Sequence, residues 1–376
     1  MSQHTIAIIE NNIIATNTIR EGLCRALKEK GFNIFVLTSG TNTDIELAKQ
    51  KGFNVINIGS STQNPLDILR YMLNIKKALK KIEADVCLTF TIRPAIWGNV
   101  VTRWLKKTPT ITNITGIGPL FERNNIAYRA ARTLYKFVLQ KTAKLFFQNQ
   151  DDMQIFLEKK FAKPQIAECI PGSGVDYTYY TPLPAKNKTE GFQFLFISRL
   201  VKDKGIVEYV KASAQIKEKY NHVQCNVIGP IWHQNLKDNT VTQNELNEWV
   251  NNGFINYLGE IKDVRQNIAN ADCIVLPSYR EGTSNVLLEA SSMAKPSITC
   301  NTTGCKEIVE DNVTGFLCNV RDVDSLAAKM NDMLKLSADQ RNEKGQRARA
   351  KIIEEYDKQI VINAYLNAVN KIINNK

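Results

Sequence analysis

Short apolar runs alternate along the chain with stretches in which apolar residues recur at helical spacing. The run Thr5–Ile9 is followed by a helical pattern at residues 19–27 that stops at Gly31. Further runs with the character of strands lie at 32–37, 86–90, 109–114 and 145–148. Strands that alternate with helices in this way favour a parallel sheet covered by helices on both faces.

A stretch rich in proline and glycine, residues 171–184, interrupts this alternation and is the best candidate for a linker. The alternation then restarts, with strands at 192–197, 223–228, 254–258, 273–276 and 297–300. We therefore expect an α/β protein of two doubly wound, Rossmann-like domains, at 1–180 and 181–357, that face each other across a cleft. Residues 358–374 have helical spacing, so we expect the segment 358–376 to be a closing helix that packs back on the first domain.

Composition limits where the protein works and what it binds. A chain of 376 residues that is 43% hydrophobic is long enough for two cores. No apolar run approaches the roughly 20 residues that span a bilayer, and the N-terminus lacks the features of a signal peptide, so we expect a cytoplasmic protein. None of the eight cysteines forms a CxxC pair, and the three histidines lack metal-ligand spacing. We therefore expect reduced thiols and neither a metal nor a cofactor.

The positive charge is concentrated in the first half of the chain. Of the net charge of +12, residues 1–185 carry +10 and the remainder carries +2. A basic face suits nucleic acid, an anionic membrane or a phosphorylated acceptor. The segment 128–147 mixes basic and apolar residues. It is either a segment that lies on an anionic membrane beside the acceptor, or an ordinary core-facing helix with a basic outer face.

The strongest candidate for chemistry is the segment 276–289, where a strand ends, a polar loop follows and a helix begins. The helix is expected to begin near Ser284 or Asn285, both of which are good N-cap residues. Backbone N–H groups at such a start bind phosphate, and Gly282 lets the backbone approach a ligand closely. Glu281 is suited to hold sugar hydroxyls, and Glu289 to accept hydrogen bonds from ribose hydroxyls. The alternative is that both acids only satisfy the helix dipole.

A second candidate motif, residues 198–205, also follows a strand and precedes a helix. Its Arg199 and Lys204 are placed to neutralise the charge that develops on a departing nucleotide diphosphate, which is work that a metal ion does in other enzymes. The alternative is a solvated basic turn.

Together, and in this order, the two motifs resemble the retaining GT-B glycosyltransferases of family four, which take a sugar from a nucleotide-sugar donor. The resemblance is clearest from residue 170 to residue 316, and the segment 170–176 is similar to the family's interdomain segment. It also rests on several glycines and one leucine, namely Gly229, Leu258, Gly259, Gly304 and Gly315.

The resemblance implies a role for each motif. Arg199 and Lys204 would bind the donor diphosphate, and Glu281 would contact the donor sugar; we expect these three residues to be catalytic. Glu289 would bind the ribose. The backbone amides around Thr283 and Ser284 would hold sugar or phosphate, and Leu258 and Gly259 would lie near the base.

The first half resembles a subgroup that extends polyprenyl-diphosphate-linked sugars in bacterial surface polysaccharide and glycan assembly. The similar segments are 91–94, 97–98 and 113–118, and residues 19–20 resemble a Phe-Arg pair of that subgroup. The resemblance implies an acceptor side that contains Arg20, Arg93, Gly116 and Gly118. Two features depart from the family. Residues 10–14 replace the glycine-rich turn of many relatives, and no histidine stands where many relatives have one beside the donor sugar.

The expected function is transfer of a sugar from a UDP-sugar to a lipid-diphosphate-linked saccharide, with retention of anomeric configuration, by a protein attached peripherally to the inner face of the cytoplasmic membrane. Two alternatives stay open. One is a nucleotide-sugar epimerase on a related fold, against which the Arg199/Lys204 and Glu281/Glu289 pattern argues. The other is a non-enzymatic basic protein that binds nucleic acid or membrane; for nucleic acid, no recognised motif is present.

Overall fold

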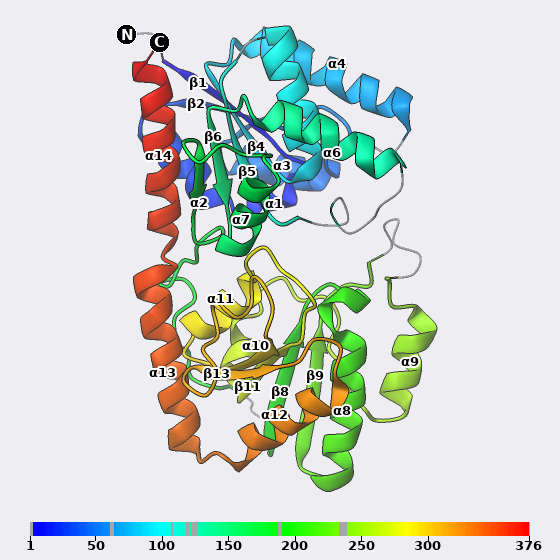
Figure 1. The fold of residues 1–376 in the computed structure, drawn as a ribbon. Helices are drawn as coiled ribbons and strands as arrows, with labels where there is room; N and C mark the ends of the chain where they lie inside the picture. Colours follow the sequence, from blue (N-terminus) through cyan, green and yellow to red (C-terminus); the bar gives the residue numbers. More distant parts are fainter. Residues whose placement is uncertain are drawn as a thin grey trace. The chain divides into compact units, whose positions relative to one another are not determined.

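The structure is a computed structural model that describes residues 3–60, 64–106, 108–117, 121, 126–186, 190–232 and 239–375, without the side chains of 104–106 and 126–128. It divides into two compact units, each a parallel sheet with helices on both faces (Figure 1). Unit 1 comprises Met1–Ser173 and Lys358–Lys376, and unit 2 comprises Gly174–Asp357. The division falls inside the predicted linker, earlier than the predicted boundary at residue 180. The predicted α/β class is confirmed.

The sheet of unit 1 has the strand order β3-β2-β1-β4-β5-β6-β7, and every pairing among its described residues is parallel. Its strands are β1 (Thr5–Ile9), β2 (Asn33–Thr38), β3 (Asn54–Asn57), β4 (Val86–Phe90), β5 (Thr110–Ile114), β6 (Lys144–Phe147) and β7 (Ala167–Cys169). The sequence pattern does not predict β3 and β7. Both are short edge strands that lack the buried apolar alternation that marks a strand.

The two faces of this sheet are covered by different helices. Ile6 and Ile8 pack in a core with residues of α2 (Glu21–Glu29) and α14 (Lys358–Asn374). Ala7 and Ile9 pack in a core with residues of α4 (Pro65–Ile82), as the alternation of side chains along a strand requires. The helices are α1 (Ile14–Asn17), α2 (Glu21–Glu29), α3 (Asn42–Gln50), α4 (Pro65–Ile82), the π-helical segments η1 (Pro94–Gly98) and η2 (Val101–Lys106), α6 (Ile126–Leu139), α7 (Gln150–Glu158) and α14 (Lys358–Asn374).

The C-terminal helix α14 belongs to unit 1 although it follows unit 2 in the chain. Tyr365 of this helix is buried, and its ring lies 4.8 Å from that of Phe146 and 5.8 Å from that of Phe90, measured between centroids. Its hydroxyl accepts a 2.7 Å hydrogen bond from Nδ2 of Asn113 on β5. These contacts fasten the last helix to the middle of the first sheet.

Unit 2 repeats the architecture with the strand order β10-β9-β8-β11-β12-β13, again parallel throughout its described pairings. The strands are β8 (Phe192–Ile197), β9 (Val223–Ile228), β10 (Asn256–Tyr257), β11 (Cys273–Leu276), β12 (Ser297–Cys300) and β13 (Gly315–Cys318). The helices are a short 3-10 turn η3 (Lys202–Lys204), α8 (Ile206–Lys219), α9 (Gln243–Asn251), α10 (Arg265–Asn270), α11 (Asn285–Ser292), α12 (Val323–Lys335) and α13 (Ala338–Glu355).

Each sheet has one point where the strand order reverses direction. In unit 2 this point lies between β8 and β11, and in unit 1 between β1 and β4. Loops that leave two such neighbouring strands turn to opposite faces of the sheet, so ligands of open α/β sheets bind at this place, beyond the carboxyl ends of the strands. The loops 198–205 and 277–284 of unit 2, and the residues after β1 and β4 of unit 1, are therefore where a site is expected.

A buried ion pair lies at the carboxyl end of β1. Arg20 and Glu10 are 6% and 1% exposed, and Nη1 of Arg20 lies 3.0 Å from Oε2 of Glu10. Thr16 donates a hydrogen bond to the other carboxylate oxygen, and the guanidinium stacks 4.1 Å above the ring of Phe90. Burial raises the pKa of Glu10, while Arg20 and Thr16 oppose that rise.

We predict that Arg20→Met destabilises unit 1 by about 3–5 kcal/mol, because it leaves the buried Glu10 carboxylate without its cation. The loss should shrink as the pH falls from about 8 to about 5, since Glu10 then takes up a proton. Urea unfolding at both pH values checks this, and the double variant Glu10→Gln/Arg20→Met should recover most of the loss. A loss under about 1 kcal/mol, equal at both pH values, would contradict it.

Candidate functional site

Two loops of unit 2 meet at the carboxyl ends of the adjacent strands β8 and β11. The first, residues 198–205, carries Lys204, and the second, residues 277–284, carries Glu281. Nζ of Lys204 lies 2.5 Å from Oε1 of Glu281, and the two side chains are only 20% and 13% exposed. The two motifs that the sequence singles out are thus joined by an ion pair.

Glu281 is fixed from behind by its own loop and by the loop after β12. The hydroxyl of Ser278, a fully buried residue, donates a 2.9 Å hydrogen bond to Oε1 of Glu281. The Glu281 N–H donates to Thr303 O at 3.0 Å. Gly304 has φ +79°, and a Cβ there would lie 2.5 Å from Glu281 O, so this position requires glycine. The backbone of Glu281 is therefore fixed by the loop after β12, and Ser278 and Lys204 hold its carboxylate.

Lys204 is held by backbone contacts between the two loops. Gly205, which follows it, has φ +74°, and a Cβ there would lie 2.1 Å from Pro277 O. The N–H of Tyr279 donates to Asp203 O at 2.9 Å. Tyr279 in turn donates its hydroxyl to Oε1 of Glu208 in α8, at 2.8 Å. The first loop is therefore seated directly on the second.

Arg199 shares the first loop but points to a different partner. Its side chain is exposed, and its guanidinium carbon lies 4.6 Å from the centre of the Trp232 ring. The structure thus brings Lys204 and Glu281 together, whereas Arg199 is stacked on an aromatic ring and accessible to solvent.

Glu289 lies on the second turn of α11, the helix that the second loop enters. Burial raises the pKa of its carboxyl to about 7, and a hydrogen bond with the Tyr180 side chain opposes part of that rise. Part of the Glu289 side chain still reaches solvent. A carboxyl group with a pKa near neutrality is charged or neutral according to small changes in its surroundings, as is common at functional sites.

The start of α11 has the predicted form. Ser284 is the N-cap, Asn285 is the first residue of the helix, and the Ser284 side chain accepts a hydrogen bond from the Leu287 N–H. The Ser284 N–H donates to Gly304 O at 3.1 Å, so this amide is engaged within the protein. The neighbouring Gly282 and Thr283 complete the loop.

Leu258 and Gly259 directly follow β10, at the same carboxyl edge of the sheet as the two loops. Leu258 is 44% exposed, and Gly259 O accepts a 2.9 Å hydrogen bond from the Gly229 N–H. An exposed apolar side chain beside a fixed turn suits a flat ring, but its role as a base contact stays a prediction.

The predicted acceptor-side residues of unit 1 have different surroundings. Arg93 is exposed and precedes η1, and Gly116 has φ +133° in the chain after β5. Arg20 is buried in its pair with Glu10, so its guanidinium supports the loop after β1 from inside. Gly118 lies outside the described residues.

Sequence reasoning missed two neighbours of the acids, Ser278 and Tyr180. Ser278 stands three residues before Glu281 in the same loop. This short spacing within the motif could have pointed to the contact. Tyr180 lies in the linker stretch, distant in sequence from Glu289, and nothing in its local pattern points to that contact.

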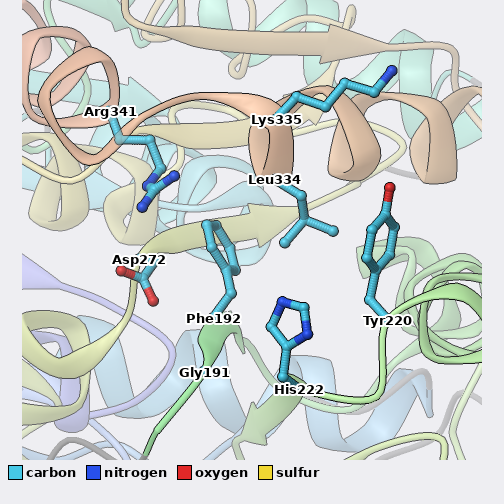
Figure 2. A pocket seen from close by; sticks show the side chains of 8 residues that line it. All are labelled: Gly191, Phe192, Tyr220, His222, Asp272, Leu334, Lys335 and Arg341. Carbon is cyan, nitrogen blue, oxygen red and sulfur yellow. The ribbon is translucent and has the colours of Figure 1, made fainter.

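A hollow of about 520 Å³, lined by Phe192, Tyr220, His222 and Arg341 among others, lies elsewhere on unit 2 (Figure 2). Phe192 begins β8, and His222 and Asp272 precede β9 and β11. The hollow is therefore at the amino ends of the strands, the opposite edge of a parallel sheet from the two loops.

Within the described part of the chain, no three His, Cys, Asp or Glu side chains gather so that they could hold a metal ion.

Comparison with known families identifies both units. Residues 184–351 match the family described as "Glycosyl transferases group 1", and residues 8–149 match the family described as "Glycosyl transferase 4-like". The chain is a glycosyltransferase built of these two family domains. Both candidate loops of unit 2 lie within the group 1 domain.

Two relatives are similar to this glycosyltransferase over most of its length. The N,N'-diacetylbacillosaminyl-diphospho-undecaprenol alpha-1,3-N-acetylgalactosaminyltransferase of Campylobacter jejuni is 22% identical over 327 residues, which cover 83% of this chain and 84% of the relative. The UDP-Gal:alpha-D-GlcNAc-diphosphoundecaprenol alpha-1,3-galactosyltransferase of Escherichia coli is 26% identical over 275 residues, 68% of each chain.

Solved structures share the fold of the glycosyltransferase. A glycosyltransferase from Rickettsia africae superposes with a TM-score of 0.80 at 20% identity, over 100% of both chains. The Anabaena protein HepE, crystallised with UDP-glucose, superposes with a TM-score of 0.79 at 18% identity, over 98% of this chain and 99% of that one. These neighbours confirm the predicted GT-B class.

In the part of the chain that the structure describes, no helix is long and apolar enough to cross a membrane.

We predict that Glu289→Gln removes a pH dependence of stability. The pKa of about 7 in the folded chain lies above the ordinary 4.5, so the folded chain binds the proton more tightly than the unfolded chain. This stabilisation is fully present below about pH 4.5 and is lost as the pH rises through 7. Between about pH 5 and pH 8 the wild type should lose about 1–3 kcal/mol more than the variant.

Urea unfolding of both proteins at the two pH values measures this difference. Glu248→Gln, which removes an exposed carboxyl group in α9, serves as the matched control and should keep the wild-type pH dependence. Equal pH dependence in the wild type and Glu289→Gln would show that Glu289 titrates like a solvated carboxyl group.

Proposed function

We propose that this glycosyltransferase moves a hexose or N-acetylhexosamine from a UDP-sugar to a lipid-diphosphate-linked saccharide, with retention of anomeric configuration, in surface polysaccharide or glycan assembly. The observation that carries the proposal is the Lys204–Glu281 pair at the strand-order reversal of unit 2. It joins a cation suited to a diphosphate and an acid suited to sugar hydroxyls within one hydrogen bond's length.

Lys204 and Arg199 stabilise the donor diphosphate. As the bond between the anomeric carbon and the β-phosphate oxygen breaks, negative charge grows on UDP, and fixed cations stabilise that charge most where water is partly excluded. Lys204 is only 20% exposed, and a diphosphate offers it more negative charge than the single carboxylate of Glu281. Arg199 is exposed and is free to turn from Trp232 towards the same phosphates.

Two acids bind the sugars of the donor. Glu281, released from Lys204 by the diphosphate, accepts hydrogen bonds from the transferred sugar while Ser278 keeps its carboxylate in place. Glu289 binds the ribose, for which its carboxylate form is the better acceptor. Since the pKa of Glu289 is about 7, donor binding strengthens as the pH rises through neutrality. The cations do the work of a metal ion, so transfer proceeds without one.

The acceptor is inferred from the relatives and from the charge. Both relatives described above are named for acceptors linked to diphospho-undecaprenol, and the second is named for a UDP-galactose donor. Residues 1–185 of this chain carry +10 of the net charge, which favours an acceptor that bears a diphosphate. The same charge favours peripheral attachment of unit 1 to an anionic membrane on its cytoplasmic face.

We predict that Lys204→Ala and Glu281→Ala each lower the rate of sugar transfer by about 100- to 1000-fold, because each removes a group that acts on the donor as its bond breaks. Transfer of a radiolabelled sugar to a lipid-diphosphate acceptor in detergent measures the rate. Lys202→Ala, from the same turn but paired with Glu245 at 3.1 Å, and Glu310→Gln, paired with Lys351, are the matched controls. Full rates in both alanine variants would refute the mechanism.

UDP-sugars should raise the melting temperature of the chain more than GDP- or ADP-sugars do, and EDTA should leave that shift unchanged. Thermal unfolding against a panel of donors measures both effects. Stabilisation by another nucleotide class would correct the donor, and loss of the shift in EDTA would show that a metal ion takes part. Consumption of the donor without any acceptor, to give an isomeric nucleotide-sugar, would instead indicate an epimerase.

A further inference from the structure

Helix α4 of unit 1 exposes a row of leucines that do not pack in the core of the unit. Leu66, Leu69 and Leu73 are 72%, 54% and 44% exposed. Residues three and four positions apart share one face of a helix, so the three leucines form a continuous stripe over the first turns of α4. Large apolar side chains that gather on a surface in this way mark an interaction site more often than single exposed ones do.

The opposite face of α4 packs against the sheet of unit 1. Tyr71, Ile75, Ala78 and Leu79 are buried and pack against Ala7 and Ile9 of β1. The helix therefore has one apolar face for the core of unit 1 and a second apolar stripe towards solvent. An ordinary surface helix needs only the first.

The outward face becomes strongly basic where the leucines end. The exposed side chains that continue it are those of Lys76, Lys77, Lys80 and Lys81, with Arg70 beside the leucines. Over its 18 residues the helix contains five basic side chains and one acidic one, Asp67. An apolar stripe next to lysines on a single helix is the pattern of segments that lie in the interface of an anionic bilayer.

A second cationic feature lies on the same side of the sheet as α4, on helix α6. Both α4 and α6, which lie near each other in unit 1 in Figure 1, contact η1. The outer side of α6 contributes Arg129, Arg132 and Lys136 to a hollow of about 680 Å³, to which Lys159 adds a fourth cation; none of the described residues that line it is acidic. Basic charge on this side of the sheet is thus not confined to α4.

We infer that the leucine stripe of α4 inserts into the headgroup region of an anionic lipid bilayer, while the lysines that follow it contact the lipid phosphates. Two copies of this face would repel each other through their lysines, so a second copy of the chain is not the partner. Nucleic acid offers phosphates but no apolar surface for three leucines. The inference deepens the proposed function, in which the acceptor is carried by a lipid, and is tested independently of it.

The test is co-sedimentation of the full chain with vesicles of phosphatidylcholine and about 30% phosphatidylglycerol. We expect binding by the wild type, and a loss of about tenfold or more in the partition coefficient for Leu66→Ser/Leu69→Ser/Leu73→Ser. The matched control Leu47→Ser/Val250→Ser/Ile353→Ser removes three apolar side chains that are 42%, 38% and 39% exposed elsewhere. It should bind like the wild type.

The lysines are tested in the same way. Lys76→Gln/Lys77→Gln/Lys80→Gln should lower binding to the anionic vesicles by about tenfold or more and reduce its dependence on salt. Lys211→Gln/Lys219→Gln/Lys335→Gln, from exposed positions of unit 2, should not. Circular dichroism and melting temperature verify that every variant is folded. If the triple leucine variant does not fold, vesicle binding is measured instead with Leu66→Ser alone, which changes the most exposed leucine.

Vesicle binding by the leucine variant within about twofold of the wild type, or no binding by the wild type, overturns the inference. Transfer to a lipid acceptor dissolved in detergent separates this result from the proposed function. The leucine variant should keep the wild-type rate there, because its donor loops are untouched. Absence of transfer by the wild type in detergent would refute the proposed function and leave the vesicle result standing.

Discussion

The ion pair between Lys204 and Glu281 ties together the two loops that leave unit 2's sheet where its strand order reverses. The pair is only partly exposed, so either charge would be costly to leave alone. Its geometry depends on two glycines, Gly205 against Pro277 and Gly304 against Glu281, and on the buried hydroxyl of Ser278. The chemistry that we propose for the donor follows from this constraint, since a diphosphate replaces one partner of the pair and a sugar the other.

Much of the fold could be predicted from the sequence because buried parallel strands leave long apolar runs. The runs at β1, β4, β8 and β11 and the helical spacing of α14 are plain in the chain. The pattern does not predict β3, β7 and β13. β3 and β7 are short and lie partly exposed at the edge of a sheet, so they lack the apolar run of a buried strand. β13 has only four residues and begins with a glycine. The division at Ser173 precedes the expected boundary at residue 180 because most of the predicted linker, from Gly174 onwards, belongs to unit 2.

For the candidate site, the sequence predicts the residues that belong to local motifs but not the contacts between distant segments. Glu281 and Lys204 stand out as polar residues between a strand and a helix, and the sheet topology alone brings these two loops together. Their direct pairing, the stacking of Arg199 on Trp232 and the contact of Tyr180 with Glu289 depend on side-chain packing between distant segments. The burial of Arg20 against Glu10 is of the same kind, because a charged residue near a strand end looks exposed in the sequence.

In the proposed mechanism, Lys204 exchanges Glu281 for the diphosphate of the donor. Calorimetric titration of UDP into the wild type and Glu281→Gln tests it most directly. If the carboxylate competes for Lys204, its loss should strengthen UDP binding by about fivefold, and the gain should vanish when Lys204→Ala is added. Weaker UDP binding by Glu281→Gln, or a gain that persists without Lys204, would contradict the account.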